Sequence, residues 1–173
     1  MRLLKMSDRN PEMNDTEQVI NWRTVGVKRE RHHEALISRL TLNDKSIFVY
    51  LKDLMVFAAM VGHDLNIRRP LKGETIEIIL DTYASDQKDG FIYLLALIEK
   101  KDGLVLKDEN LRETVQIFEE YCNAGLYEIT NWLDNNPGDP IGIDTLLTKI
   151  LAKLVENDSQ GPVDPNTIEV TLN

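Results

Sequence analysis

The sequence has one cysteine and no long hydrophobic run, and each of these scarcities excludes a class of protein. Cys122 cannot form an internal disulfide, and the apolar part of the N-terminal segment MRLLKMSDRNPEMND is too short for a signal peptide. The longest apolar runs, LMVFAAMVG and FIYLLALI, fall far short of the roughly 20 residues that cross a bilayer. We therefore expect a cytoplasmic protein with no membrane span.

Positive charge is scarce in the C-terminal part of the chain. Residues 1–101 carry 16 Lys and Arg against 15 Asp and Glu, whereas residues 102–173 carry 4 against 14, and the formal net charge is −9. Because affinity for duplex DNA rises with the number of phosphates that a protein neutralises, the acidic part opposes DNA binding. We do not expect direct, non-specific binding to DNA, although the N-terminal part can still form a small basic patch.

The chain is long enough for one domain that needs no cross-link to fold. Apolar residues at helical spacing predict an all-α, compact single domain of six to seven helices over residues 21–156. Residues 1–20 are polar and lack an apolar period, so they are expected to be a flexible leader. Residues 157–173 form a C-terminal tail, in which the alternating segment TIEVTL is either a short strand or an unstructured end.

Most of the expected helices begin at residues that cap helices well. Two of them have clear stop signals, Gly62 and Asn135-Asn136-Pro137-Gly138. The segment after Thr75 is interpreted as a helix, although its composition also fits a brief strand. The segment after Asp108 contains either a break or a kink at Asn123-Ala124-Gly125. The predicted helical segments are residues 28–39, 47–61, 75–83, 87–101, 108–134 and 145–156.

The stretch GHDLNIRRPLKG, residues 62–73, sets a group of cations on an otherwise acidic chain. Gly62 is expected to end the preceding helix in a left-handed conformation, and Pro70 is expected to stiffen the loop. Arg68, Arg69 and Lys72 allow two interpretations. They pair with acidic helices of the same molecule, or they bind the carboxylates or phosphates of a partner.

No set of residues has the spacing of a metal or cofactor site, and none is expected. In His32-His33-Glu34 the two imidazoles point about 100° apart on a helix, so we expect His33 on the core face and His32 outside. Asp81, Glu99 and Lys101 resemble the metal-and-lysine arrangement of restriction-type nucleases, but that arrangement needs two adjacent strands. FIYLLALIEKK is instead typical of a helix.

Three segments together resemble one protein family: YLKDLMVFAAMVGHDLNIRRPLK, FIYLLALIEKKDGLVL and IFEEYCNAGLYEITNWL. The chain resembles the DNA phosphorothioation (Dnd) system-associated protein 4 family over about residues 28–155. The resemblance implies a bacterial defence setting, in which genes that place sulfur in the DNA backbone stand beside genes that restrict invading DNA. The matching polar positions that a fold alone does not demand are Arg69, Lys72, Glu120 and Asn123.

These observations predict a non-catalytic accessory or regulatory protein of a phosphorothioation-linked anti-phage restriction system. It is expected to bind a larger protein of the same system, and a homodimer stays open although no heptad seam specifies one. Two alternatives are a metal-dependent nuclease using Asp81, Glu99 and Lys101, and a DNA-binding regulator using the 28–39 helix. The predicted partner-binding residues are Arg68, Arg69, Lys72, Glu120 and Asn123.

Overall fold

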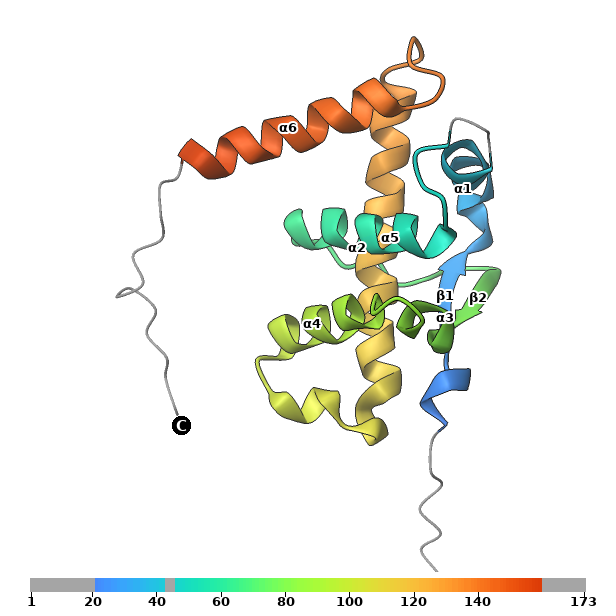
Figure 1. Cartoon of the computed structure of the whole chain (residues 1–173), viewed down its shortest axis with the longest axis vertical. Coiled ribbons are helices and arrows are strands. Elements are labelled where there is room, and N and C mark those ends of the chain that lie inside the picture. Colours follow the sequence, from blue (N-terminus) through green and yellow to red (C-terminus); the bar gives the residue numbers. More distant parts are fainter. Residues whose placement is uncertain (1–20, 43–45, 160–173) are drawn as a thin grey trace, which may run out of the picture.

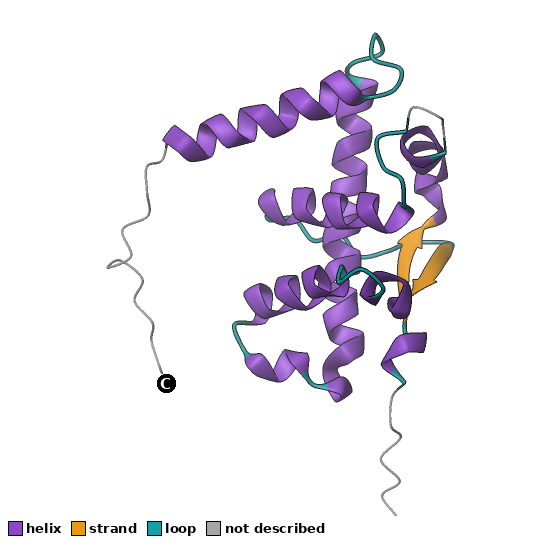
Figure 2. Ribbon diagram, viewed as in Figure 1, coloured by secondary structure: helices purple, strands orange, loops and turns teal. Residues whose placement is uncertain are grey.

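The computed structural model describes residues 21–42 and 46–159, which form a mostly helical fold around one long helix (Figures 1 and 2). The predicted helical class is therefore confirmed. The helices are α1 (Glu34–Thr41), α2 (Leu51–Asp64), α3 (Leu80–Ala84), α4 (Asp89–Lys100), α5 (Leu111–Asp134) and α6 (Ile143–Ser159). The strands are β1 (Gly26–Glu30) and β2 (Thr75–Ile79). The predicted leader and the TIEVTL segment lie outside the described residues.

Helix α5 forms the axis of the molecule, and α2 and α4 pack across it (Figure 1). Its central turns are buried on nearly every side, because α2, α4 and β1 cover different faces. The core between these elements consists of large apolar side chains such as Leu54, Leu95, Phe118 and Leu126. Within the described residues no helix combines the length and the hydropathy that a membrane span requires.

A two-stranded antiparallel sheet replaces two predicted helical segments. β1 pairs with β2 from Gly26 opposite Ile79 to Glu30 opposite Thr75. The predicted 28–39 helix is therefore wrong in its first turns, since regular α-helix begins only at Glu34. The helical interpretation after Thr75 is wrong over Thr75–Ile79, which forms β2, whereas Leu80 and Tyr83 do lie in a helix, α3. Short segments such as these take their conformation from a distant pairing partner, which local pattern does not reveal.

The same correction removes the recognition helix of the DNA-binding alternative. Lys28 and Arg29 lie on β1, and Arg31 lies in the 3-10 turn that follows it. The Arg29 side chain is buried and donates to Glu34 at 2.9 Å. These cations therefore do not line one exposed helical face.

The C-terminal end of α2 also differs from the prediction. Gly62 lies inside the helix, which continues to Asp64, and the left-handed residue is Asn66, with φ of 55°. The amide of Ile67 then donates to the carbonyl of Gly62 at 3.0 Å, which closes the helix end. Asparagine tolerates the left-handed region better than most residues, so it serves where glycine was expected.

Helix α5 runs through residues 123–125 without a break, and α6 extends away from its far end as an arm (Figure 1). The turn between them is held by Asp139, whose carboxylate accepts from the amides of Gly142 and Thr145. Leu146 is buried, whereas the next apolar residues of α6 are exposed. Those exposed residues are Leu147, Ile150, Leu151, Leu154 and Val155.

Candidate functional site

The loop of residues 65–74 leaves α2, crosses α5 and enters β2 (Figure 1). Its backbone is tethered to buried groups at three points. The amide of Arg69 donates to the carbonyl of Glu120 at 3.0 Å, and the amide of Lys72 donates to Glu30 Oε1 at 2.7 Å. Asn123 Nδ2 donates to the carbonyl of Arg69 at 3.2 Å. The loop is therefore held in one conformation against β1 and α5.

A buried polar cluster beneath the loop supplies these tethers. Glu30 accepts from Asn123 Nδ2 at 3.0 Å and from the Tyr127 hydroxyl at 3.0 Å. Burial acts to raise the pKa of Glu30, but the hydrogen bonds from Lys72, Asn123 and Tyr127 outweigh it and lower the pKa. Glu30 is therefore an ionised carboxylate, and its hydrogen bonds connect β1 with the 65–74 loop and with α5.

The two histidines lie as predicted. His33 is buried, and its Nε2 lies 2.8 Å from Asn123 Oδ1, so it extends the cluster around Glu30. His32 is exposed, and its ring stacks on Tyr127 at a centroid separation of 5.5 Å. The two imidazoles therefore lie in different environments, His33 in the core and His32 at the surface.

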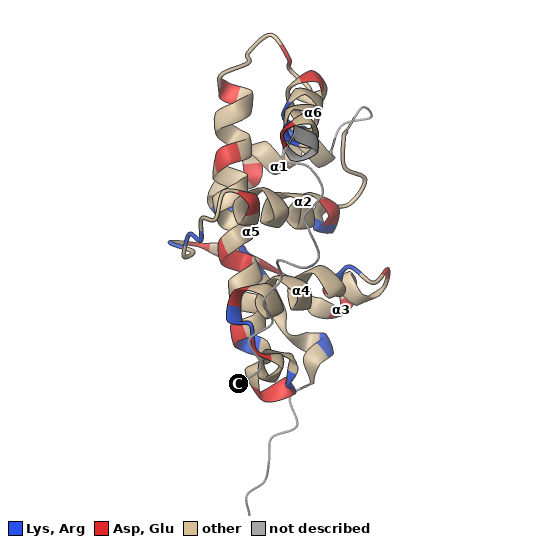
Figure 3. Ribbon diagram, turned by 90° about the vertical axis from the view of Figure 1, so that its left-hand side faces the viewer, with Lys and Arg blue, Asp and Glu red and all other residues tan. Residues whose placement is uncertain are grey.

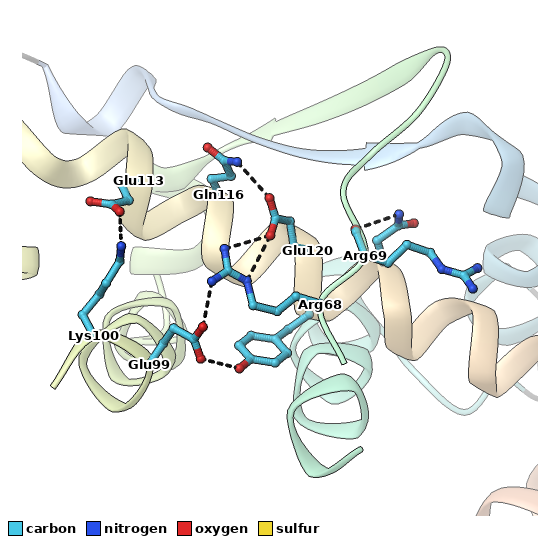
Figure 4. A network of polar contacts seen from close by, with 9 residues as sticks. Arg68, Arg69, Glu99, Lys100, Glu113, Gln116 and Glu120 are labelled. Atoms are coloured by element: carbon cyan, nitrogen blue, oxygen red, sulfur yellow. Dashed lines mark hydrogen bonds and ion pairs between the residues drawn. The ribbon is translucent and has the colours of Figure 1, made fainter. Parts of the chain in front are cut away.

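Arg68 points into the molecule and connects α4 with α5 (Figure 4). Its Nη1 lies 2.8 Å from Glu99 Oε1, and its Nη2 lies 2.8 Å from Glu120 Oε2. The hydroxyl of Tyr121 donates to Glu99 Oε2 at 2.6 Å. Together, the Tyr121 hydroxyl and Arg68 lower the pKa of Glu99. Arg68 thus pairs with acidic residues of its own chain.

Arg69 points the opposite way from Arg68 (Figure 4). Its guanidinium carbon lies 3.9 Å from the centroid of the Tyr127 ring, and its side chain is exposed. Lys72 is exposed as well, and across the described part of the chain no carboxylate forms an ion pair with either cation. A hollow of about 260 Å³, lined in part by Ile67 and Asn131, adjoins Arg69 and Tyr127.

The five predicted site residues therefore divide by exposure. Arg69 and Lys72 face solvent, Arg68 is partly buried, and Glu120 and Asn123 are only 7% and 1% exposed. The last two hold the loop from beneath and do not reach the surface.

Two contributors to the site were missed by sequence reasoning. Tyr127 follows Asn123 by four residues on α5, and this helical spacing is a signal that places both on one face. Glu30 offered no such signal, because its position depends on the pairing of β1 with β2.

The nuclease arrangement does not form. Asp81 lies on α3 and pairs with Arg23 at 3.5 Å, while Glu99 lies on α4 and is held by Arg68. Lys101 follows α4 in a left-handed conformation. The sequence pattern needs Asp81 and Glu99 on adjacent strands, but both lie on helices. In addition, no group of three His, Cys, Asp or Glu within residues 21–42 and 46–159 could hold a metal ion.

Comparison with known families gives a match over most of the chain. Residues 26–164 match the family described as DNA sulphur modification system-associated protein 4. The matched range contains the loop, its tethers and the six α-helices of the described residues. Comparison with curated proteins and with solved structures found no match. Since the matched region exceeds half of the chain, this protein belongs to the DNA sulphur modification system-associated protein 4 family.

Proposed function

We propose that this protein is a non-catalytic accessory protein of a DNA sulphur modification system and of its linked anti-phage restriction. It acts in the cytoplasm by binding a larger protein of the same system. The family description supports an association with such a system. The observation that supports the binding role is the pair Arg69 and Lys72. Both side chains are exposed on a tethered loop, and neither forms an ion pair with a carboxylate of the described residues.

The chemistry of this surface favours an acidic segment of the partner. A guanidinium binds a carboxylate through two parallel hydrogen bonds, and the Tyr127 ring beneath Arg69 holds its plane in place. The tethers at Glu30, Glu120 and Asn123 order the loop before binding, so less conformational entropy is lost on association. Arg69 and Lys72 therefore form a preformed site for carboxylates.

The experiment is a comparison of three tagged proteins expressed in the native host. The wild type is expected to retain a larger protein encoded by the same system. A double variant, Arg69→Ala with Lys72→Ala, is expected to lose most of that capture. The control, Lys101→Ala with Lys107→Ala, removes two other exposed lysines and equal charge, so it is expected to retain the partner.

Two outcomes would contradict the proposal. Equal loss of capture in both double variants would show that net charge, and not this loop, determines binding. A gel shift of DNA at low salt that disappears only in the Arg69→Ala, Lys72→Ala protein would assign the loop to phosphates instead.

A further inference from the structure

The two edges of the small sheet differ in what covers them. On the edge formed by β1, the amide of Lys28 donates to Glu119 Oε1 at 2.7 Å, and the carbonyl of Gly26 accepts from Arg112 Nη1 at 2.9 Å. Glu119 and Arg112 both lie on α5, so side chains of this helix take the place of a third strand beside β1. The other edge is formed by β2, on the side of the pair away from α5 (Figures 1 and 2).

The register shows which groups of β2 point outward. Lys28 lies opposite Glu77, and its amide turns away from β2 to reach Glu119. In an antiparallel pair, two opposite residues either exchange both hydrogen bonds or both point their amides and carbonyls outward. Glu77 therefore presents its amide and its carbonyl to the outer edge, and the amides of Thr75 and Ile79 point the same way. Within the part of the chain that the structure describes, no hydrogen bond reaches these amides.

The pattern of these open groups matches one kind of ligand. The outward groups of Thr75 and Glu77 recur about 7 Å apart, which is the rise of two strand residues. Another extended backbone carries acceptors and donors at the same interval, whereas a helix has its own backbone groups paired internally. The ligand that fits β2 is therefore an extended segment of polypeptide, which binds by adding a strand to the sheet.

The charge of Glu77 disfavours a second copy of β2 as the added strand. Glu77 is exposed at the middle of the strand, between Thr75 and Ile79. A symmetric antiparallel pair that uses all three outward amides sets the two Glu77 carboxylates directly opposite each other. Like charges in this position destabilise a pair of strands. A segment with an uncharged residue opposite Glu77 avoids this repulsion.

We propose that an extended segment of the partner protein pairs with β2 as a third strand and places its carboxylates at Lys72. This inference rests on the proposed function, because it describes how the same partner binds. β2 begins three residues after Lys72, so a segment that pairs with β2 and continues beyond Thr75 lies next to the loop. Figure 3 shows acidic residues along α5 and, beside it, a projecting loop with basic residues. Main-chain hydrogen bonds then supply affinity, and the loop cations select an acidic segment.

The probe for the test is a set of overlapping synthetic peptides that covers the sequence of the captured partner. Fluorescence anisotropy measures their binding to the purified full chain. Glu77→Pro removes an outward amide without removing a hydrogen bond to β1, and it is expected to weaken the bound peptide about tenfold. Glu77→Ala keeps the amide and removes a charge that repels an acidic segment, so it is expected to strengthen binding about twofold.

A second readout uses only the wild type, so it does not depend on how the fold tolerates a proline. Amide hydrogen exchange is followed by NMR. In the free protein the Glu77 amide is expected to exchange faster than the amides of Ile76 and Ile78, which donate to β1. Saturation with the bound peptide is expected to slow exchange at Glu77 at least about tenfold, since a new hydrogen bond protects it.

The variants separate this inference from the proposed function. Peptide binding that is lost in Arg69→Ala with Lys72→Ala, while exchange at Glu77 stays fast in the wild-type complex, would overturn the added strand and leave the proposed function standing. Equal weakening by Glu77→Pro and Glu77→Ala would assign the effect to the side chain and also overturn it. Slow exchange at Glu77 in the free protein would show that the edge is already paired. A wild type that retains no protein of the system would overturn both proposals.

Discussion

Gly62 and Gly125 face each other where α2 crosses α5. A β-carbon on Gly62 would lie 2.0 Å from the carbonyl oxygen of Tyr121 and 3.2 Å from the amide nitrogen of Gly125. A β-carbon on Gly125 would lie 1.8 Å from the carbonyl oxygen of Ala58. Each glycine therefore gives the opposite backbone the room that the crossing requires, and this crossing positions the loop that follows α2.

Alanine at either position is expected to destabilise the protein. The added methyl group meets backbone, which cannot move aside as a side chain does, so the expected cost is about 1–3 kcal/mol even though alanine favours helix. Gly90 in α4 is the control, because a β-carbon there meets nothing within 4 Å. Gly90→Ala is expected to stabilise by about 0.5 kcal/mol. Urea unfolding of the three variants checks this, and equal effects at all three sites would contradict it.

Arg68 and Arg69 are adjacent in the sequence but are expected to differ in their effect on stability. Arg68→Ala leaves the mostly buried Glu120 carboxylate without its cation, at a cost of about 1–3 kcal/mol. Arg69→Ala with Lys72→Ala removes an exposed cation–π contact and an unpaired charge, so its cost is at most about 1 kcal/mol. Thermal unfolding measures both variants. A larger loss of thermal stability in the double variant than in Arg68→Ala would show that Arg69 and Lys72 stabilise the fold.

Stability is expected to fall as the pH drops below 6.5, in part because of His33. Burial lowers its pKa and outweighs the hydrogen bond to Asn123 and the charge of Glu30, which act to raise it. In the unfolded chain the imidazole takes up a proton near pH 6.5, while in the folded chain it stays neutral to lower pH. The unfolded state thus binds more protons, and the free energy of unfolding falls through this window.

The measurement for His33 is urea unfolding at pH 7.5 and pH 5.5. His33→Gln is expected to show a smaller decrease between the two pH values than the wild type. Burial raises the pKa of Glu119, but this carboxyl titrates in both proteins, so their difference isolates His33. Identical decreases would show that His33 does not contribute.

Purified protein is expected to leave plasmid DNA intact in the presence of magnesium. Glu99 is held by Arg68 and Tyr121, and Asp81 lies on another helix paired with Arg23. Agarose gel electrophoresis checks this result. Cleavage that disappears in Glu99→Ala would restore the nuclease interpretation.

Local sequence was sufficient for the main helices and for the orientation of some side chains. The apolar runs in α2 and α4 and the periodic stripe of α5 predict helices because burial of one face requires that spacing. His33 inside and His32 outside follow from the same geometry. The cations of the loop were also visible, since Arg69 and Lys72 are conspicuous in an acidic chain.

Tertiary structure alone decided the features that depend on distant partners. β1 and β2 are strands because Gly26–Glu30 pairs with Thr75–Ile79, although neither segment specifies this by itself. Gly62 lies within α2 because the backbone of α5 packs against it and leaves no room for a side chain. The sequence of α2 alone does not show this close approach. The adjacent residues Arg68 and Arg69 likewise differ in the folded chain. Arg68 forms internal ion pairs because folding brings Glu99 and Glu120 next to it, whereas Arg69 stays exposed.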